Sequence, residues 1–176
     1  GYSANVGFIS AIMRAGDHIF LDQYSHASIV DGAILAKSKT VFFRHNNPMD
    51  VERKLLKCSG KKLVVVEGVY SMDGDSPDLK RLASLRKRFG FCWVLDEAHA
   101  TGWYGATGSG LQEAQGAFAA ADIVVGTLGK GLGSQGAYVL SHAPEVRDAL
   151  VGEMPDGEVQ EHRRRRVEPP PGAEGS

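Results

Sequence analysis

Several features that would mark a secreted, membrane-spanning or nucleic-acid-binding protein are scarce in this sequence. Its two cysteines, Cys58 and Cys92, do not have the spacing of a metal-binding pair, and Cys92 lies in an apolar run that favours a buried, reduced thiol. No apolar run approaches the roughly 20 residues of a membrane span. The net charge is −1, which argues against nucleic acid as a main partner. We therefore expect a protein of the reducing cytoplasm, without a membrane span.

The two ends of the sequence differ from its middle part. The sequence has no initiator Met and no signal peptide, and its first residues already resemble folded protein, so we infer that an upstream segment is missing. From about Gly152 onward apolar residues almost disappear, with four arginines at 163–166 and three prolines at 169–171. Such a stretch cannot bury enough surface to offset its ordering entropy. We expect one domain at residues 1–151 and a disordered tail at 152–176.

Short apolar runs alternate with helical patterns along the domain. We predict strands at residues 18–22, 40–44, 63–67, 91–96, 122–127 and 137–140, and helices at 5–15, 27–37, 48–56 and 78–89. Continuous runs such as Leu63 to Val66 favour strands that are buried on both faces. Pro48 and Pro77 each suit the first turn of a helix. The alternation predicts an α/β fold with a mainly parallel sheet and helices on both faces.

The motif DEAH at residues 96–99 follows the apolar run that ends at Leu95. A carboxylate at the C-terminal end of a buried strand is where α/β folds place ligand-binding groups. A helicase of the DEAH type would also need a phosphate loop, GxxxxGK followed by Ser or Thr. The one GK pair, Gly129-Lys130, has Val124 where that loop needs glycine and Gly131 where it needs a hydroxyl, so the nucleotide hypothesis fails. A purely structural Asp96 that caps the next segment remains possible.

The glycine-rich stretch around Lys130 admits two interpretations. Residues 131–136 match GxGxxG, but the next run, at 137–140, is typical of a strand, whereas the dinucleotide fingerprint needs a helix there. Glycine on both sides of Lys130 would let a lysine approach a flat cofactor. A surface turn explains the same residues. Two further motifs, SHAS at 25–28 and EGVYSMDGD at 67–75, are by themselves a helix start and a polar loop.

Taken in order, SHAS, EGVYSMDGD, DEAHATG and GTLGKGLGSQGAYV resemble the α-oxoamine synthases, a family of pyridoxal-phosphate enzymes. The resemblance covers about residues 1–151. It implies the large domain of the fold type I pyridoxal-phosphate transferases, truncated here, because family members have a segment before this region and a C-terminal domain after it. For the complete family protein it also implies a homodimer.

The resemblance assigns roles to particular residues. Lys130 would hold pyridoxal phosphate as a Schiff base, and Asp96 would pair with the pyridine nitrogen and keep the ring an electron sink. His26 would stack on the ring and His99 would bond its hydroxyl. The remaining cofactor contacts would come from Ser71, Thr127 and the backbone N–H groups of Gly1 and Tyr2, at a helix start suited to a phosphate. No metal is implied.

The implied reaction condenses an amino acid, alanine favoured, with an acyl-CoA thioester. Lys130, once displaced, would take the α-proton, and nearby positive charge should lower the pKa of its amine. Carbon dioxide is then lost and an α-amino ketone remains, as in biotin synthesis. Other members of the family use other amino acids or keep the carboxylate, and those alternatives stay open. A non-catalytic cofactor-binding fragment is a further alternative.

Overall fold

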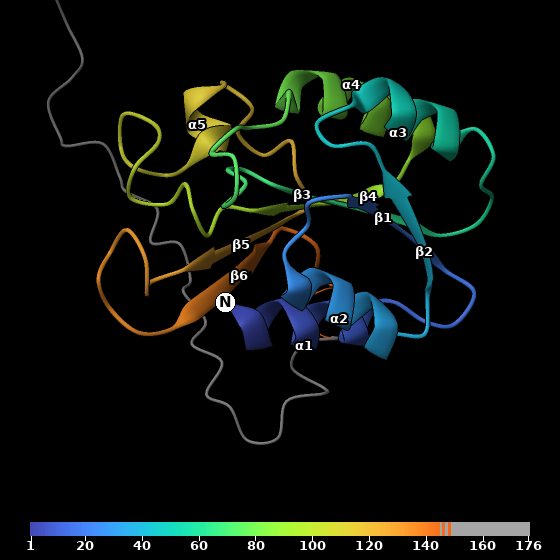
Figure 1. Cartoon of the computed structure of the whole chain (residues 1–176), viewed down its shortest axis with the longest axis horizontal. Coiled ribbons are helices and arrows are strands. Elements are labelled where there is room, and N and C mark those ends of the chain that lie inside the picture. Colours follow the sequence, from blue (N-terminus) through green and yellow to red (C-terminus); the bar gives the residue numbers. More distant parts are fainter. Residues whose placement is uncertain (145, 147, 149–176) are drawn as a thin grey trace, which may run out of the picture.

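The computed structural model describes residues 1–144, 146 and 148, drawn in colour in Figure 1. The predicted disordered tail at residues 152–176 lies outside the described residues. The boundary predicted at residue 151 lies outside them as well.

A six-stranded sheet forms the middle layer of the described chain, in the order β2-β1-β3-β4-β5-β6 (Figure 1). Neighbouring strands are parallel except for β5 and β6, which are antiparallel. The prediction of a mainly parallel sheet is confirmed. The strands are β1 (His18–Asp22), β2 (Lys39–Phe43), β3 (Lys62–Glu67), β4 (Cys92–Asp96), β5 (Ile123–Thr127) and β6 (Ala137–Ser141).

Helices cover both faces of this sheet, as predicted (Figure 1). One face carries α1 (Tyr2–Ile12) and α2 (Ala27–Leu35), and the other carries α3 (Pro48–Leu55), α4 (Leu79–Phe89) and the short α5 (Leu111–Ala114). Because strand side chains alternate, β3 sends Val64 and Val66 into one apolar cluster and Leu63 and Val65 into the other. This two-sided burial explains the continuous apolar run, and the edge strands β2 and β6 are more exposed.

The helix boundaries differ from the predicted ones for local reasons. The helix α1 begins and ends earlier than the predicted 5–15, because Met13 is extended at φ −110° and Asp17 closes a turn by accepting from the Arg14 backbone N–H at 2.9 Å. The helix α2 stops before Lys37, whose φ of 53° is left-handed. The expected role of Pro77 is wrong, since this residue precedes the N-cap of α4.

The side chains that start two helices show why one proline prediction held and the other did not. Asn47 caps α3 by accepting from the Asp50 backbone N–H at 3.0 Å, and Pro48 is the first helical residue, as predicted. At α4 the cap is Asp78, whose carboxylate accepts from the Arg81 N–H at 2.9 Å.

The expectation of a buried thiol at Cys92 is also wrong. This side chain is only partly buried, where it packs against the apolar cluster between the sheet and the helices α1 and α2.

Candidate active site

Loops at the C-terminal ends of β1, β3, β4 and β5 meet the starts of α1 and α2 around a cavity of about 200 Å³. Ligands of open α/β sheets bind at this end of the strands. All of the predicted site residues except Ser71 lie on its wall. The lining residues are Gly1, Tyr2, Asn5, His26, Ser28, Glu67, Asp96, Ala98, His99, Thr127 and Lys130.

Asp96 ends β4 and is buried, with 5% of its surface exposed. One carboxylate oxygen accepts from the Asn5 side-chain amide at 2.8 Å, and the other accepts from the Ala98 backbone N–H at 2.9 Å. Both oxygens are therefore used as acceptors, and the carboxylate is held in one orientation.

His26 is the N-cap of α2. Its ring nitrogen Nδ1 lies 3.2 Å from the backbone N of Ser28 and 2.8 Å from the Ser28 hydroxyl, so the ring is held by its own helix. The His26 backbone N–H donates to Glu67 at 2.6 Å. The ring of Tyr2 meets the His26 ring edge-on, with centroids 6.5 Å apart, and the Tyr2 hydroxyl donates to Asp31.

Lys130 lies in the loop after β5, and its amine is 3.4 Å from Nδ1 of His99. Partial burial lowers the pKa of the Lys130 amine, although the negative charges of Asp96 and Glu67 oppose the shift. Burial and the neighbouring Lys130 lower the pKa of His99. The predicted direction for Lys130 is right, but the expected cause is wrong, since desolvation acts on it rather than nearby positive charge.

The N-terminus of α1 lies beside the end of β5. A Cβ placed on Gly1, the N-cap of α1, would be 3.8 Å from the Cβ of Thr127. No side chain caps this helix start in the described structure, so its first N–H groups remain available to an anion. The buried Thr127 hydroxyl donates to the Gly136 carbonyl at 3.0 Å and orders the Lys130 loop. The phosphate contacts of Gly1, Tyr2 and Thr127 stay predictions.

The glycine that follows Lys130 is required by the protein itself. A Cβ on Gly131 would lie 2.5 Å from the Thr101 carbonyl oxygen and 2.7 Å from the Trp103 ring. Close packing of the Lys130 loop against the segment after β4 therefore accounts for this glycine, and space for a cofactor is not needed to explain it. The 131–136 loop leads into a strand, β6, so the context of a dinucleotide fingerprint is not met.

Glu97, the second acid of the DEAH motif, has a structural role. It is fully buried, and its carboxylate accepts from the backbone N–H groups of Leu111 and Gln112 at 3.0 and 2.9 Å. These bonds hold the first turn of α5, a helix that the sequence analysis missed. Burial raises the pKa of Glu97.

Glu67 is a site residue that sequence reasoning did not single out. It ends β3 beside Asp96 in the parallel register, and 3% of its surface is exposed. Burial raises its pKa to about 7, and the Asp96 charge adds to the shift, while the His26 N–H opposes it. A carboxylate that ends a buried apolar run, as Asp96 does, was the signal that could have identified it.

Asn5 and Ser28 were missed as well. Asn5 is 3% exposed and belongs to the buried side of α1, four residues before Ile9. Its amide donates to the Ser28 hydroxyl at 3.1 Å as well as to Asp96. A polar side chain on the apolar face of a helix was the available signal.

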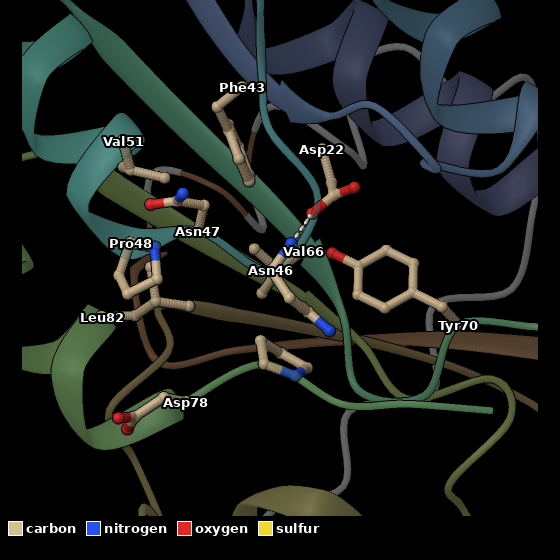
Figure 2. A pocket seen from close by; sticks show the side chains of 11 residues that line it. Asp22, Phe43, Asn46, Asn47, Pro48, Val51, Val66, Tyr70, Asp78 and Leu82 are labelled. Atoms are coloured by element: carbon tan, nitrogen blue, oxygen red, sulfur yellow. Dashed lines mark hydrogen bonds between the residues drawn. The ribbon is translucent and has the colours of Figure 1, made fainter. Parts of the chain in front are cut away.

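Ser71 lies apart from this cavity, and its side chain is exposed in the loop after β3. The neighbouring Tyr70 borders a second, smaller cavity of about 10 Å³, shown in Figure 2, which has room for one water molecule. The Tyr70 hydroxyl and Oδ1 of Asn46 are buried there without a partner among the described residues. Burial raises the pKa of Tyr70. The cofactor contact of Ser71 stays a prediction.

A histidine that is hydrogen-bonded to two carboxylates supports the loop that carries Ser71. The ring of His45 bridges Asp22, at 2.8 Å, and Asp75, at 2.9 Å, and so joins the ends of β1 and β2 to the loop after β3. Burial opposes protonation of His45, but its bonds to both carboxylates outweigh burial and raise its pKa. Asp73 lies close enough to complete a metal-type cluster. Since both ring nitrogens already face carboxylates, we interpret the group as a support for the loop.

The family follows from the comparison of sequences. The model of the aminotransferase class I and II family matches residues 1–155, so the chain belongs to that family. Within it, the 8-amino-7-oxononanoate synthase of Geotalea daltonii is 46% identical over 154 residues, 86% of this chain and 39% of that enzyme. The serine palmitoyltransferase of Caulobacter vibrioides is 44% identical over 144 residues, 80% of this chain and 36% of that enzyme. The predicted resemblance to α-oxoamine synthases is confirmed.

Solved structures agree with these sequence relatives. A variant serine palmitoyltransferase from S. paucimobilis, with a bound pyridoxal phosphate–myriocin adduct, matches with a TM-score of 0.81 and 40% identity over 85% of this chain and 38% of that one. An 8-amino-7-oxononanoate synthase from Francisella tularensis matches with a TM-score of 0.74 and 29% identity, over 87% and 44%. The fold type I prediction is confirmed, and the chain spans about two fifths of the length of these relatives.

None of the helices in the described part of the chain has both the length and the apolar character of a membrane span.

Proposed function

We propose that this chain is the cofactor-binding part of a pyridoxal-phosphate-dependent acyltransferase, which joins an amino acid to the acyl group of a CoA thioester. The observation that carries the proposal is the convergence of Lys130, Asp96 and His26 on one cavity, in a chain of the aminotransferase class I and II family. The named relatives support it, since they include both 8-amino-7-oxononanoate synthases and serine palmitoyltransferases.

The residues present fit the cofactor. A buried, oriented carboxylate at Asp96 suits a protonated pyridine nitrogen, and an amine with a lowered pKa at Lys130 suits an aldehyde. The uncapped start of α1 suits a phosphate. Oδ1 of Asn5 is buried on the same wall and has no partner among the described residues, so the protein leaves an acceptor unused there.

When bound, pyridoxal phosphate supplies an electron sink that stabilises a carbanion at the α-carbon of an amino acid. Asp96 would accept a hydrogen bond from the ring nitrogen and keep its proton in place. The Lys130 amine, whose pKa is lowered by burial, would take the α-proton as a general base. Nδ1 of His99 lies 3.4 Å from that amine, and the lowered pKa of His99 favours a neutral imidazole that can accept a hydrogen bond from it.

We infer further that alanine and a pimeloyl thioester are the substrates, with loss of carbon dioxide, as in biotin synthesis. The basis is the combination of DEAHATG with GSQGAYV in this chain. Serine with a palmitoyl thioester is the leading alternative, because serine palmitoyltransferases are similar to this chain over most of its length. The homodimer and the cytoplasmic location stay predictions.

Release of CoA tests this proposal. The purified protein, supplied with pyridoxal phosphate, is assayed for free thiol with alanine or serine against pimeloyl-CoA or palmitoyl-CoA, and Lys130→Ala is the control. We expect little release from this chain, because it spans about two fifths of the length of its relatives, with the fastest release from alanine and pimeloyl-CoA and none from the control. A preference for serine and palmitoyl-CoA would instead support the activity of a serine palmitoyltransferase. Cofactor binding without any release would favour the non-catalytic alternative.

A further inference from the structure

One amide group connects two of the predicted cofactor contacts. Asn5 is buried in α1, and its two side-chain N–H groups donate in different directions, to Asp96 at 2.8 Å and to the hydroxyl of Ser28 at 3.1 Å. Ser28 in turn contacts the ring of His26, with its Oγ 2.8 Å from Nδ1. Asn5 therefore links the buried carboxylate to the histidine, both of which line the cavity.

The hydrogen bonds that link Asn5, Ser28 and His26 each have a preferred direction. A backbone N–H can only donate, so the Ser28 N–H at 3.2 Å favours a lone pair on Nδ1 of His26. Because the Ser28 oxygen already accepts from Asn5, its own proton is free to donate to the same Nδ1. Two donors thus meet Nδ1, and the ring proton of His26 is placed on Nε2.

The same amide determines how Asp96 is oriented. The Ala98 N–H occupies one carboxylate oxygen and Asn5 occupies the other, so rotation of the carboxylate would break both bonds. Asn5 is neutral and adds no charge beside Asp96. Its own oxygen is left without a partner among the described residues, and a buried unpaired acceptor costs about 1–3 kcal/mol. This cost fits a residue whose role lies in the site.

We propose that Asn5 is a positioning residue that, through a single amide, orients the Asp96 carboxylate and directs the Ser28 hydroxyl proton to Nδ1 of His26, which strengthens the preference for the Nε2–H tautomer. The inference rests on the proposed cofactor site for its functional meaning. The hydrogen-bond chain itself is a property of the cofactor-free protein, so it can be tested separately.

The decisive variants are Asn5→Leu, which removes both donors at similar size, and Ser28→Ala, which cuts the connection to His26 while the Asn5–Asp96 bond remains. Ser10→Ala is the matched control, because Ser10 lies on the same helix and its hydroxyl donates to the Gly7 carbonyl of that helix. Each protein is prepared with ¹⁵N-labelled histidine and without cofactor. The ring signals of His26 are assigned by their loss in His26→Gln.

We expect the wild type and Ser10→Ala to show His26 with Nδ1 unprotonated and Nε2 protonated. Asn5→Leu and Ser28→Ala should show a larger share of the Nδ1–H tautomer, because the Ser28 hydroxyl is no longer directed to Nδ1 and only the backbone N–H of residue 28 remains as a donor. In titrations with pyridoxal phosphate, Asn5→Leu should bind at least tenfold more weakly, and Ser28→Ala should lose less affinity because Asp96 remains held. An unchanged tautomer in both variants, or wild-type affinity in Asn5→Leu, would overturn the proposal. If Asn5→Leu does not fold, Ser28→Ala decides by the tautomer alone. A wild type that binds no pyridoxal phosphate would instead refute the proposed function.

Discussion

Replacing Glu67 by glutamine should remove a pH dependence of stability that this buried carboxyl creates. Burial raises the pKa of Glu67 from the ordinary 4.5 to about 7, so between these values the folded state holds a proton that the unfolded state has released. The stability contributed by this proton is fully present below pH 4.5. It is lost as the pH rises through about 7.

The magnitude follows from the size of the shift. A difference of about 2.5 between the two pKa values, at about 1.4 kcal/mol per pKa unit, corresponds to about 3.5 kcal/mol, of which about 3 kcal/mol is lost between pH 4.5 and 8.5. Glu67 is 3% exposed, so solvent screening reduces this figure little. Glutamine keeps an oxygen that can accept from the His26 N–H at the observed 2.6 Å, and it cannot titrate.

Urea denaturation of the cofactor-free protein at intervals from pH 4.5 to 8.5 measures the effect. The free energy of unfolding of the wild type, minus that of Glu67→Gln, should fall by about 3 kcal/mol across this range. Subtraction removes the titration of other groups, such as His45 and Glu97. Met72→Leu, in an exposed position of the following loop, removes no titratable group, so it is the control and should give a flat difference. A difference that is flat for Glu67→Gln as well would refute the buried, protonated carboxyl.

Three further substitutions test other parts of the site. Asp96→Asn should keep the fold but lose most deuterium exchange at the α-carbon of alanine in the presence of pyridoxal phosphate. It should also lower the free energy of unfolding in urea by about 1–3 kcal/mol, because both oxygens of Asp96 accept hydrogen bonds. Undiminished exchange would show that Asp96 has only a structural role. Gly131→Ala should cost about 1–3 kcal/mol and weaken cofactor binding, since its Cβ would press on the Thr101 carbonyl, and a stable variant with wild-type affinity would contradict this packing. Glu97→Ala should cost at least about 2 kcal/mol by leaving two N–H groups of α5 unpaired, and protease resistance of residues 105–116 equal to the wild type would argue against that role.

The fold was predictable because its signals are local and repeated. Continuous apolar runs marked the buried strands, and strand–helix alternation marked the parallel sheet with helices on both faces. Boundaries were less accurate where a single side chain decides them, as Asp78 does at α4 and the left-handed Lys37 does at α2. The helix α5 was missed because a buried acid distant in sequence, Glu97, holds its first turn.

The site was predictable where a motif carried it. Lys130, Asp96, His26 and His99 were placed by ordered motifs, and the structure brings them together at one cavity. Supporting residues such as Asn5 act through hydrogen bonds between segments far apart in the chain, 91 residues in the case of its bond to Asp96. A pattern within one segment cannot reveal such a contact. Likewise, the cause of the lowered Lys130 pKa is burial, which depends on the packed structure.

The central claim, that Lys130 holds pyridoxal phosphate at this cavity, is tested most directly by trapping the bond. The protein is incubated with pyridoxal phosphate, reduced with borohydride, digested, and mapped by mass spectrometry. We predict that the label lies on Lys130, and that it is lost in Lys130→Ala and diminished in Asp96→Asn. Label on Lys61 or Lys62 in place of Lys130, or no label above that of a denatured control, would contradict the assignment.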